Sequence, residues 1–302
     1  MNTVQSTAYG LEVMLRMLFG HPPAMDAKST INERLDILGN ARPTATEKMQ
    51  MGILVAGNKG HEVTVGNGGI GLTSILDHMS TNASVYNPMP FCMRTVDEDL
   101  PLPQRIKYAL RKEVTVGGIN YYAYYGLRLA IGVDDVHIVK KKITTEGETV
   151  IEEPWAPTTS DLYPDPIKLP QTGAVTSTDV KIQVSAITTV KLNASDIEEY
   201  INVAKIMYGG DERYAVLSEF ALCTGADRQV TVQSTSGNIN FVESIGTQAF
   251  AFAADHKAVY YNSQELTLDF DVGAQIPLLG TASIPTLETI GTLAANPNEV
   301  TP

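Results

Sequence analysis

The sequence predicts an α+β protein with a helical N-terminal region, a predominantly antiparallel β body of sandwich or barrel type and an extended C-terminal arm. Three observations predict this class: helical spacing of apolar residues near the start, β-branched and aromatic runs from residue 113 onward, and a charge-poor end. We expect a mainly helical region at 1–112, a β-rich body at 113–276 and the arm at 277–302. With 302 residues, such a chain buries about three-quarters of its unfolded surface.

Helices are expected first. Apolar residues at intervals of three and four place one stripe on a helical face, namely Leu11, Met14, Leu15 and Leu18. Gly20 and the following prolines end that helix. A second helix is expected from about Ser29, with Ile31, Leu35 and Leu38 on its apolar side, and a third from Thr46 to Val55.

The β body begins with a Val-, Ile- and Tyr-rich stretch at 113–133 that Gly117-Gly118 interrupts. Residues 136–153 predict a hairpin that turns at Glu146-Gly147, with mixed faces typical of an exposed or partner-facing ribbon. Residues 154–170 carry five prolines, which favours a crossing segment or linker. The single tryptophan, Trp155, is placed to pin that segment to a surface.

A strand is expected at 179–192, followed by the clearest helix of the chain, near 195–208. Ser195 and Glu198 have the spacing of a capping box, and Gly209-Gly210 end the helix. Six short strands are then expected within 214–272, at the spacing of a sandwich or barrel.

Charge and cysteine content limit the classes of function. The chain has 22 basic and 34 acidic residues, a net charge of −12, which disfavours nucleic acid and anionic membranes as partners. Two widely spaced cysteines, Cys92 and Cys223, indicate a reducing compartment. No apolar run approaches the roughly 20 residues that cross a bilayer, and the first residues do not resemble a signal peptide. The low charged share, 19%, favours burial in a subunit interface or an unusually large core.

One motif raises the alternative of a nucleotide-binding domain. Residues 66–71 read G-x-G-x-x-G between an expected strand and an expected helix, the setting of a dinucleotide fingerprint. Against this hypothesis, the upstream strand alternates polar and apolar residues, and the acidic cluster at 97–99 follows a proline-rich segment instead of a second strand. A glycine loop before a helix explains the motif as well.

The remaining constellations predict no catalytic, cofactor-binding or metal-binding residue. The five histidines show no ligand spacing: His21, His61, His78, His137 and His256. A metal site assembled by the fold stays open. The acidic groups Asp134-Asp135, Asp161 with Asp165, and Asp269 with Asp271 lack the pattern of a calcium loop, so we interpret them as solvated turn carboxylates. Cys223 lies in an apolar strand, as a buried small side chain would.

A nucleic-acid hypothesis rests on basic and aromatic groups that lie close in sequence. They are Arg105, Lys107, Arg111, Lys112 and Lys140–Lys142, with Tyr121, Tyr122, Tyr124 and Tyr125. Tyrosines stack on bases, but they are also favoured at protein interfaces. The net negative charge favours the interface.

The stretches 127–170, 196–232 and 245–278 resemble virion structural proteins of tailed bacteriophages. This resemblance implies a multicopy ring or shell, no enzymatic activity, no cofactor, and synthesis in the bacterial cytoplasm before incorporation into the virion. It implies copies of the same chain and neighbouring portal, connector or tail proteins as partners, with no membrane and no sequence-specific nucleic acid, only passive contact with the path of packaged DNA. A neck, collar or head–tail connector position is expected first; tail, baseplate and capsid decoration are alternatives. The hairpin at 136–153 and the arm are expected to cross subunit boundaries.

Overall fold

The computed structural model describes residues 4–18, 27–66, 69–146, 148–162, 180–234, 237–259 and 265–277. The chain divides into two compact units, Met1–Val136 with Thr188–Val272, and His137–Ile187 with Gly273–Pro302. The described part is α+β and mostly antiparallel β, as the sequence predicts.

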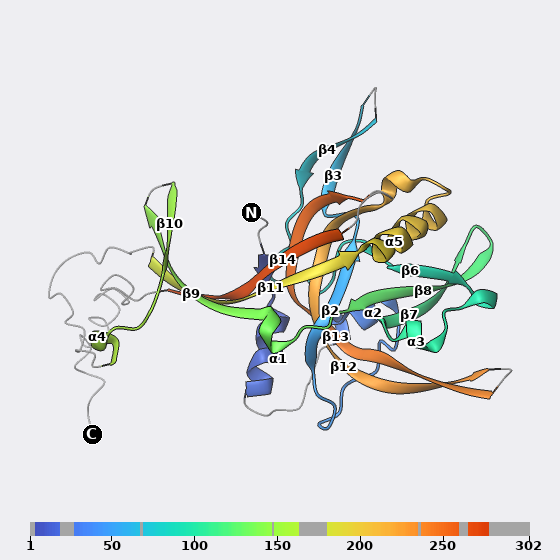
Figure 1. The fold of residues 1–302 in the computed structure, drawn as a ribbon, viewed down its shortest axis with the longest axis horizontal. Helices are drawn as coiled ribbons and strands as arrows, with labels where there is room; N and C mark the ends of the chain where they lie inside the picture. Colours follow the sequence, from blue (N-terminus) through green and yellow to red (C-terminus); the bar gives the residue numbers. More distant parts are fainter. Residues whose placement is uncertain are drawn as a thin grey trace, which may run out of the picture. The chain divides into compact units, whose positions relative to one another are not determined.

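The first unit is built on one large sheet (Figure 1). Its strands follow the order β1-β13-β12-β2-β8-β6, with β5 paired to β2 and β7 to β8. The bounds are β1 (Val4–Ser6), β2 (Gln50–Gly57), β5 (Pro88–Met89), β6 (Cys92–Thr95), β7 (Tyr108–Val116), β8 (Ile119–Arg128), β12 (Val216–Ser234) and β13 (Gly237–Ala258). Among the described strands this sheet is open, with no closed barrel.

Helices pack on this sheet and complete the core. α1 (Ala8–Leu18) and α2 (Ile31–Leu35) contact β13, and α5 (Ala194–Met207) contacts β6. The ring of Tyr200 on α5 lies 6.1 Å from that of Phe91. α3 (Leu102–Arg105) leads into β7, and short 3-10 turns occur at Ala27–Ser29, Val96–Glu98, Val133–Asp135 and Glu212–Tyr214.

Two hairpins extend from the large sheet in Figure 1. β12 and β13 pair in antiparallel register from Val216 to Ser234. β7 and β8 join through Gly117 and Gly118, which have φ values of 60° and 81°, as a tight hairpin turn requires. A separate hairpin joins β3 (His61–Gly66) to β4 (Gly69–Ile75).

The second unit contains most of the ribbon predicted at 136–153. β9 (Val136–Glu146) pairs with β10 (Thr149–Pro154) from Glu146 opposite Thr149, which confirms the hairpin. The sheet order is β10-β9-β11-β14, where β11 (Val180–Asn193) and β14 (Glu265–Pro277) contribute residues to both units.

The segment after this hairpin is partly described. The backbone N–H of Trp155 donates to the Lys140 carbonyl at 3.0 Å, and the Trp155 ring centroid lies 5.8 Å from Lys140 Nζ, so this residue contacts β9. One helical turn follows, α4 (Thr159–Leu162). The rest of the crossing segment, and the arm beyond Pro277, lie outside the described residues.

The expectation of a mainly helical region at 1–112 is wrong. The helix expected at 46–55 is instead β2, whose Ile53–Ala56 run is buried between β12 and β8. A run of consecutive apolar residues suits a central strand buried on both faces as well as a helix. α2 is shorter than expected because Asp36 adopts a left-handed conformation with φ 55° and ends it after Leu35.

Three residues of the apolar stripe expected on α1 are exposed. Leu11, Met14 and Leu15 are 48%, 45% and 44% exposed, whereas Val13 is buried. Gly10 faces β13 so closely that an added Cβ would collide with the Phe250 backbone. Close approach through a small residue therefore sets the orientation of this helix, instead of its largest apolar stripe.

Four of the six short strands expected within 214–272 merge into two long ones, β12 and β13, and the last is β14. Most of the strand expected at 257–262 lies outside the described residues. Positions expected as turns, such as Gly225, instead carry a register shift between Thr224 and Ala226, as a β-bulge does. The helix predicted at 195–208 is confirmed as α5, but its capping box is formed by Asn193 and Asp196, not by Ser195 and Glu198.

Candidate functional site

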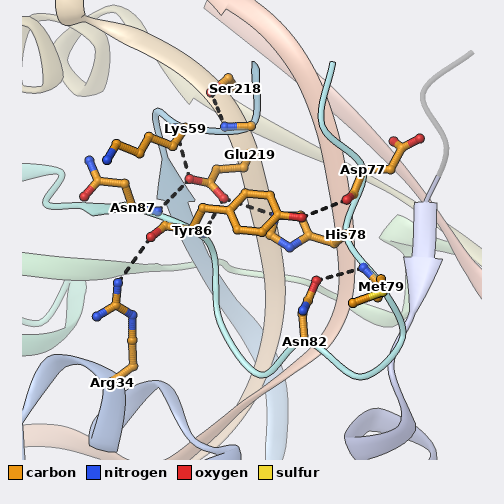
Figure 2. A network of polar contacts seen from close by, with 11 residues as sticks. Arg34, Lys59, Asp77, His78, Met79, Asn82, Tyr86, Asn87, Ser218 and Glu219 are labelled. Carbon is orange, nitrogen blue, oxygen red and sulfur yellow. Dashed lines mark hydrogen bonds and ion pairs between the residues drawn. The ribbon is translucent and has the colours of Figure 1, made fainter. Parts of the chain in front are cut away.

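A buried polar network of the first unit surrounds Glu219 on β12 (Figure 2). The side chains of Glu219 and His78 are both 0% exposed, and Glu219 Oε2 lies 3.1 Å from His78 Nε2. Backbone N–H groups supply the other donors: Tyr86 donates to Oε2 at 2.6 Å, while Asn87 and Lys59 donate to Oε1 at 2.9 and 3.1 Å. A buried carboxylate is costly without such donors, and here both oxygens are satisfied.

His78 is held in place by aromatic rings. Its imidazole stacks between Tyr86 and Phe252, with ring centroids 4.2 Å away on each side. A carboxylate–imidazole pair is found in many catalytic sites, but this pair is closed to solvent and its carboxylate has no free oxygen. We therefore interpret the Glu219 network as structural: it ties the loops at 57–60 and 77–87 to β12.

Replacing Glu219 by Gln tests this role. The amide nitrogen would face backbone N–H donors, so we expect the free energy of unfolding to fall by about 3 kcal/mol. Urea denaturation followed by circular dichroism measures the change. Glu212→Gln is the control, because Glu212 is exposed and pairs only with Lys205 at 3.0 Å; its loss should cost less than about 0.5 kcal/mol. Equal effects of the two substitutions would contradict a structural role for Glu219.

A different kind of site lies between α3, β7, β8 and β13. It is a pocket of about 150 Å³. Its walls combine apolar side chains with two arginines and one carboxylic acid; the lining residues are Leu102, Arg105, Ile106, Tyr108, Leu110, Arg111, Tyr124, Asn240, Phe241, Val242 and Glu243. Apolar walls with a few convergent polar groups are the usual composition of a binding pocket.

Two arginines in this pocket share one acidic partner. Arg105 and Arg111 both form ion pairs with Asp99, at 3.2 Å for Arg111, and the Tyr124 hydroxyl donates to the same carboxylate. The Arg111 guanidinium lies 4.6 Å from the ring centroid of Phe241. These contacts hold both arginines in fixed positions, with side chains only 14% and 15% exposed.

Glu243 lies in the same pocket in a contrasting environment. It is buried, and its carboxylate accepts a hydrogen bond from the backbone N–H of Arg111 at 3.3 Å. Burial raises the pKa of Glu243 to about 7, against the opposing effect of Arg111, Arg128 and Arg105. The carboxyl group therefore titrates near neutral pH, a property concentrated at functional sites.

The pKa of Glu243 predicts how stability depends on pH. The folded protein holds this proton up to about pH 7, against a usual value of 4.5. The raised pKa of Glu243 therefore contributes stability that is fully present below the unfolded-state pKa of 4.5 and is lost as the pH rises through 7. Glu243→Gln stays neutral, so its stability relative to the wild type should rise between pH 4.5 and 8, by up to about 3 kcal/mol. Urea denaturation at both pH values checks this; a pH-independent difference would contradict it.

The glycine motif at 66–71 does not have the strand–loop–helix setting of a dinucleotide fingerprint. Gly66 ends β3 and pairs with Gly69, the first residue of β4, in an antiparallel hairpin. The helix expected after the motif is a strand, Gly69–Ile75. A dinucleotide fingerprint needs a helix N-terminus behind the loop, and the structure has a strand there instead.

The histidines and cysteines give no metal or nucleophile site among the described residues. His61 and His256 do meet edge to face, with ring centroids 4.9 Å apart, and burial lowers the pKa of His61. No group of three or more metal-binding side chains is present in the described part of the chain. Both cysteines are buried and free, and burial raises the pKa of Cys92 to about 12, which makes an unreactive thiol.

The basic and aromatic groups considered for nucleic acid are largely occupied within the protein. Arg105 and Arg111 pair with Asp99, and Lys107 pairs with Asp196. Tyr124 and Tyr125 are buried in the core, so they offer no face for base stacking. The acidic groups are also engaged: Asp269 accepts from Thr189 at 2.7 Å, and Asp135 accepts from the Gly132 N–H at 2.8 Å.

Sequence reasoning did not identify Glu219, Glu243 or Phe241. A lone charge inside an apolar strand was the available signal for Glu219, in the run Val216–Cys223, since unpaired acidic residues are rarely buried. No comparable signal marks Phe241 and Glu243, because the pocket forms only when β13 lies beside α3 and β7.

Comparison with known proteins identifies the family. Residues 1–286 match the model of a family of unknown function, DUF7208, so the chain belongs to that family. No curated protein and no solved structure matches the chain.

Proposed function

We propose that this member of the DUF7208 family is a structural subunit of a tailed-phage virion, which acts through protein–protein contacts in a ring of identical copies. A neck, collar or head–tail connector position fits best. The observation that carries the proposal is the exposed, partly apolar β9–β10 ribbon at the open edge of the smaller sheet.

Strand β10 has the features of a strand that receives a partner. All six of its residues are exposed, including Val150 at 58% and Ile151 at 39%. On β9, Ile138 is 66% exposed. Among the described strands β10 is the last in its sheet, and an edge strand presents N–H and C=O groups that can pair with another chain.

The order of the smaller sheet suits head-to-tail assembly. β10 and β14 are its two end strands among the described residues. Addition of β10 from one copy to β14 of the next would be a heterologous contact, and such contacts close into a ring when the rotation per copy allows. Main-chain hydrogen bonds would give affinity, and alternate side chains would give register.

Charge and resemblance support the placement in a virion. The net charge of −12 would repel a DNA duplex, so a ring around the DNA path would allow passage without binding. No helix among the described residues is long and apolar enough to cross a membrane. The resemblance of 127–170 and the C-terminal half to virion structural proteins adds the phage context; tail, baseplate and capsid decoration are the alternative positions.

Lysine substitutions on β10 test the role of the ribbon. Val150 and Ile151 point to opposite faces of the strand, so Val150→Lys and Ile151→Lys probe the two faces separately. We expect at least one of them to prevent oligomer formation, because burial of an unpaired lysine charge between two copies costs free energy. Size-exclusion chromatography with light scattering measures the assembly, and unchanged thermal unfolding shows that the fold is kept. Met79→Lys is the matched control, since Met79 is 66% exposed in the first unit. Normal assembly of both β10 variants would contradict the role of the ribbon.

The position in a particle is tested directly by cryo-electron microscopy of the phage whose genome encodes the chain. We expect density for repeated copies of the large sheet and the ribbon between head and tail. A well-resolved particle without density for this chain would overturn the proposal, and density elsewhere in the particle would select one of the alternative positions.

A further inference from the structure

The pocket lined by Arg105 and Arg111, the arginine pocket, has apolar residues at its mouth. Three apolar side chains of its lining are exposed: Leu102 at 48%, Ile106 at 63% and Val242 at 37%. The same lining holds the less exposed side chains of Arg105, Arg111 and Glu243. Apolar residues around a pocket with fixed polar anchors are typical of a protein–protein contact, where the apolar rim excludes water from the polar pair.

The charges in the pocket favour an acidic occupant. The guanidinium groups of Arg105 and Arg111 share the single carboxylate of Asp99. Glu243 does not balance the second arginine while it holds its proton, and burial raises its pKa to about 7. Two guanidinium groups that share one carboxylate therefore lie next to apolar side chains, an arrangement that suits a second carboxylate. Its complement is a carboxylate flanked by apolar residues.

The C-terminal segment 278–302 of this chain has that composition. Its only charged residues are two glutamates, Glu288 and Glu299, and Glu288 lies between Leu287 and Ile290. The segment follows the last residue of β14 and has 25 residues, which span up to about 80 Å when extended.

We propose that the arginine pocket binds the C-terminal segment of a neighbouring copy, with Glu288 facing Arg105 and Arg111 and with Leu287 and Ile290 on the apolar mouth. This inference rests on the proposed function, because it supplies a second contact between copies of the ring. It differs from the β10 contact in location and chemistry: it joins a side-chain pocket to an arm instead of one strand edge to another.

Site-specific disulfide formation tests the proposal on the full-length chain. The native cysteines are buried, so introduced cysteines are the accessible ones. Ile106→Cys and Leu287→Cys, prepared separately, are mixed, allowed to exchange subunits and oxidised. We expect a covalent heterodimer on a non-reducing gel. Leu11→Cys in place of Ile106→Cys is the control, since Leu11 is a comparably exposed apolar residue on α1 and should give no heterodimer with Leu287→Cys.

The glutamate is tested in the same assay. Adding Glu288→Lys to the Leu287→Cys chain should lower the rate of heterodimer formation about tenfold, because a lysine beside two arginines is repelled. Glu299→Lys, the other carboxylate of the arm, should leave the rate unchanged. Equal rates for the two lysine variants would overturn the role of Glu288.

Three outcomes distinguish this inference from the proposed function. Oligomers that form without an Ile106–Leu287 cross-link overturn the arm contact but not the ring. A cross-link within one chain of an Ile106→Cys/Leu287→Cys double variant, with none between chains, overturns the assignment to a neighbouring copy. A protein that stays monomeric in light scattering contradicts the proposed function itself.

Discussion

The buried carboxylate of Glu219 is the interaction on which the first unit depends. Glu219 lies on β12, paired with Gly57 on β2 and with Ala254 on β13, in the middle of the large sheet. A charge at that position is stable only if donors surround it. The donors come from the chain as it leaves β2 and as it enters β5, so one side chain fixes how both loops return to the sheet. Gly57 has no side chain because an added Cβ would collide with the Glu219 carboxylate and the Asn87 carbonyl.

The two buried glutamates, Glu219 and Glu243, have different surroundings, which indicate different roles. Glu219 accepts three backbone N–H bonds and contacts His78, so its oxygens have no capacity left for a ligand. Glu243 accepts a single long bond and lies in a pocket with an apolar mouth. A saturated carboxylate stabilises the fold, while an under-saturated one beside arginines leaves a site whose charge depends on protonation. For this reason the pocket, and not the larger network, is the place to look for a partner.

The sequence predicted those features that depend on local chemistry. The α5 helix, the hairpin within 136–153 and the mainly antiparallel body follow from apolar spacing, turn residues and β-branched runs, and the structure has all three. It failed where tertiary contacts decide. α1 is oriented by the approach of Gly10 to Phe250, the Ile53–Ala56 run is a central strand, and the glycine motif at 66–71 turns a hairpin. The sequence did not predict the pocket for the same reason. Phe241 and Arg111 are 130 residues apart in the chain and meet only across the folded sheet.

The low share of charged residues in the chain, 19%, is accompanied by exposed apolar side chains on its surface. A large core could have absorbed the apolar residues, but exposed ones remain on α1, at the mouth of the arginine pocket and on the β9–β10 ribbon. Scattered exposed apolar residues are ordinary, whereas groups of them on separate elements indicate contacts with protein. A subunit with two neighbours in a ring needs at least two such surfaces, because a head-to-tail contact uses a different patch on each side. An open sheet edge and an arginine pocket are different enough in chemistry to serve different contacts without competing for the same segment of a neighbour.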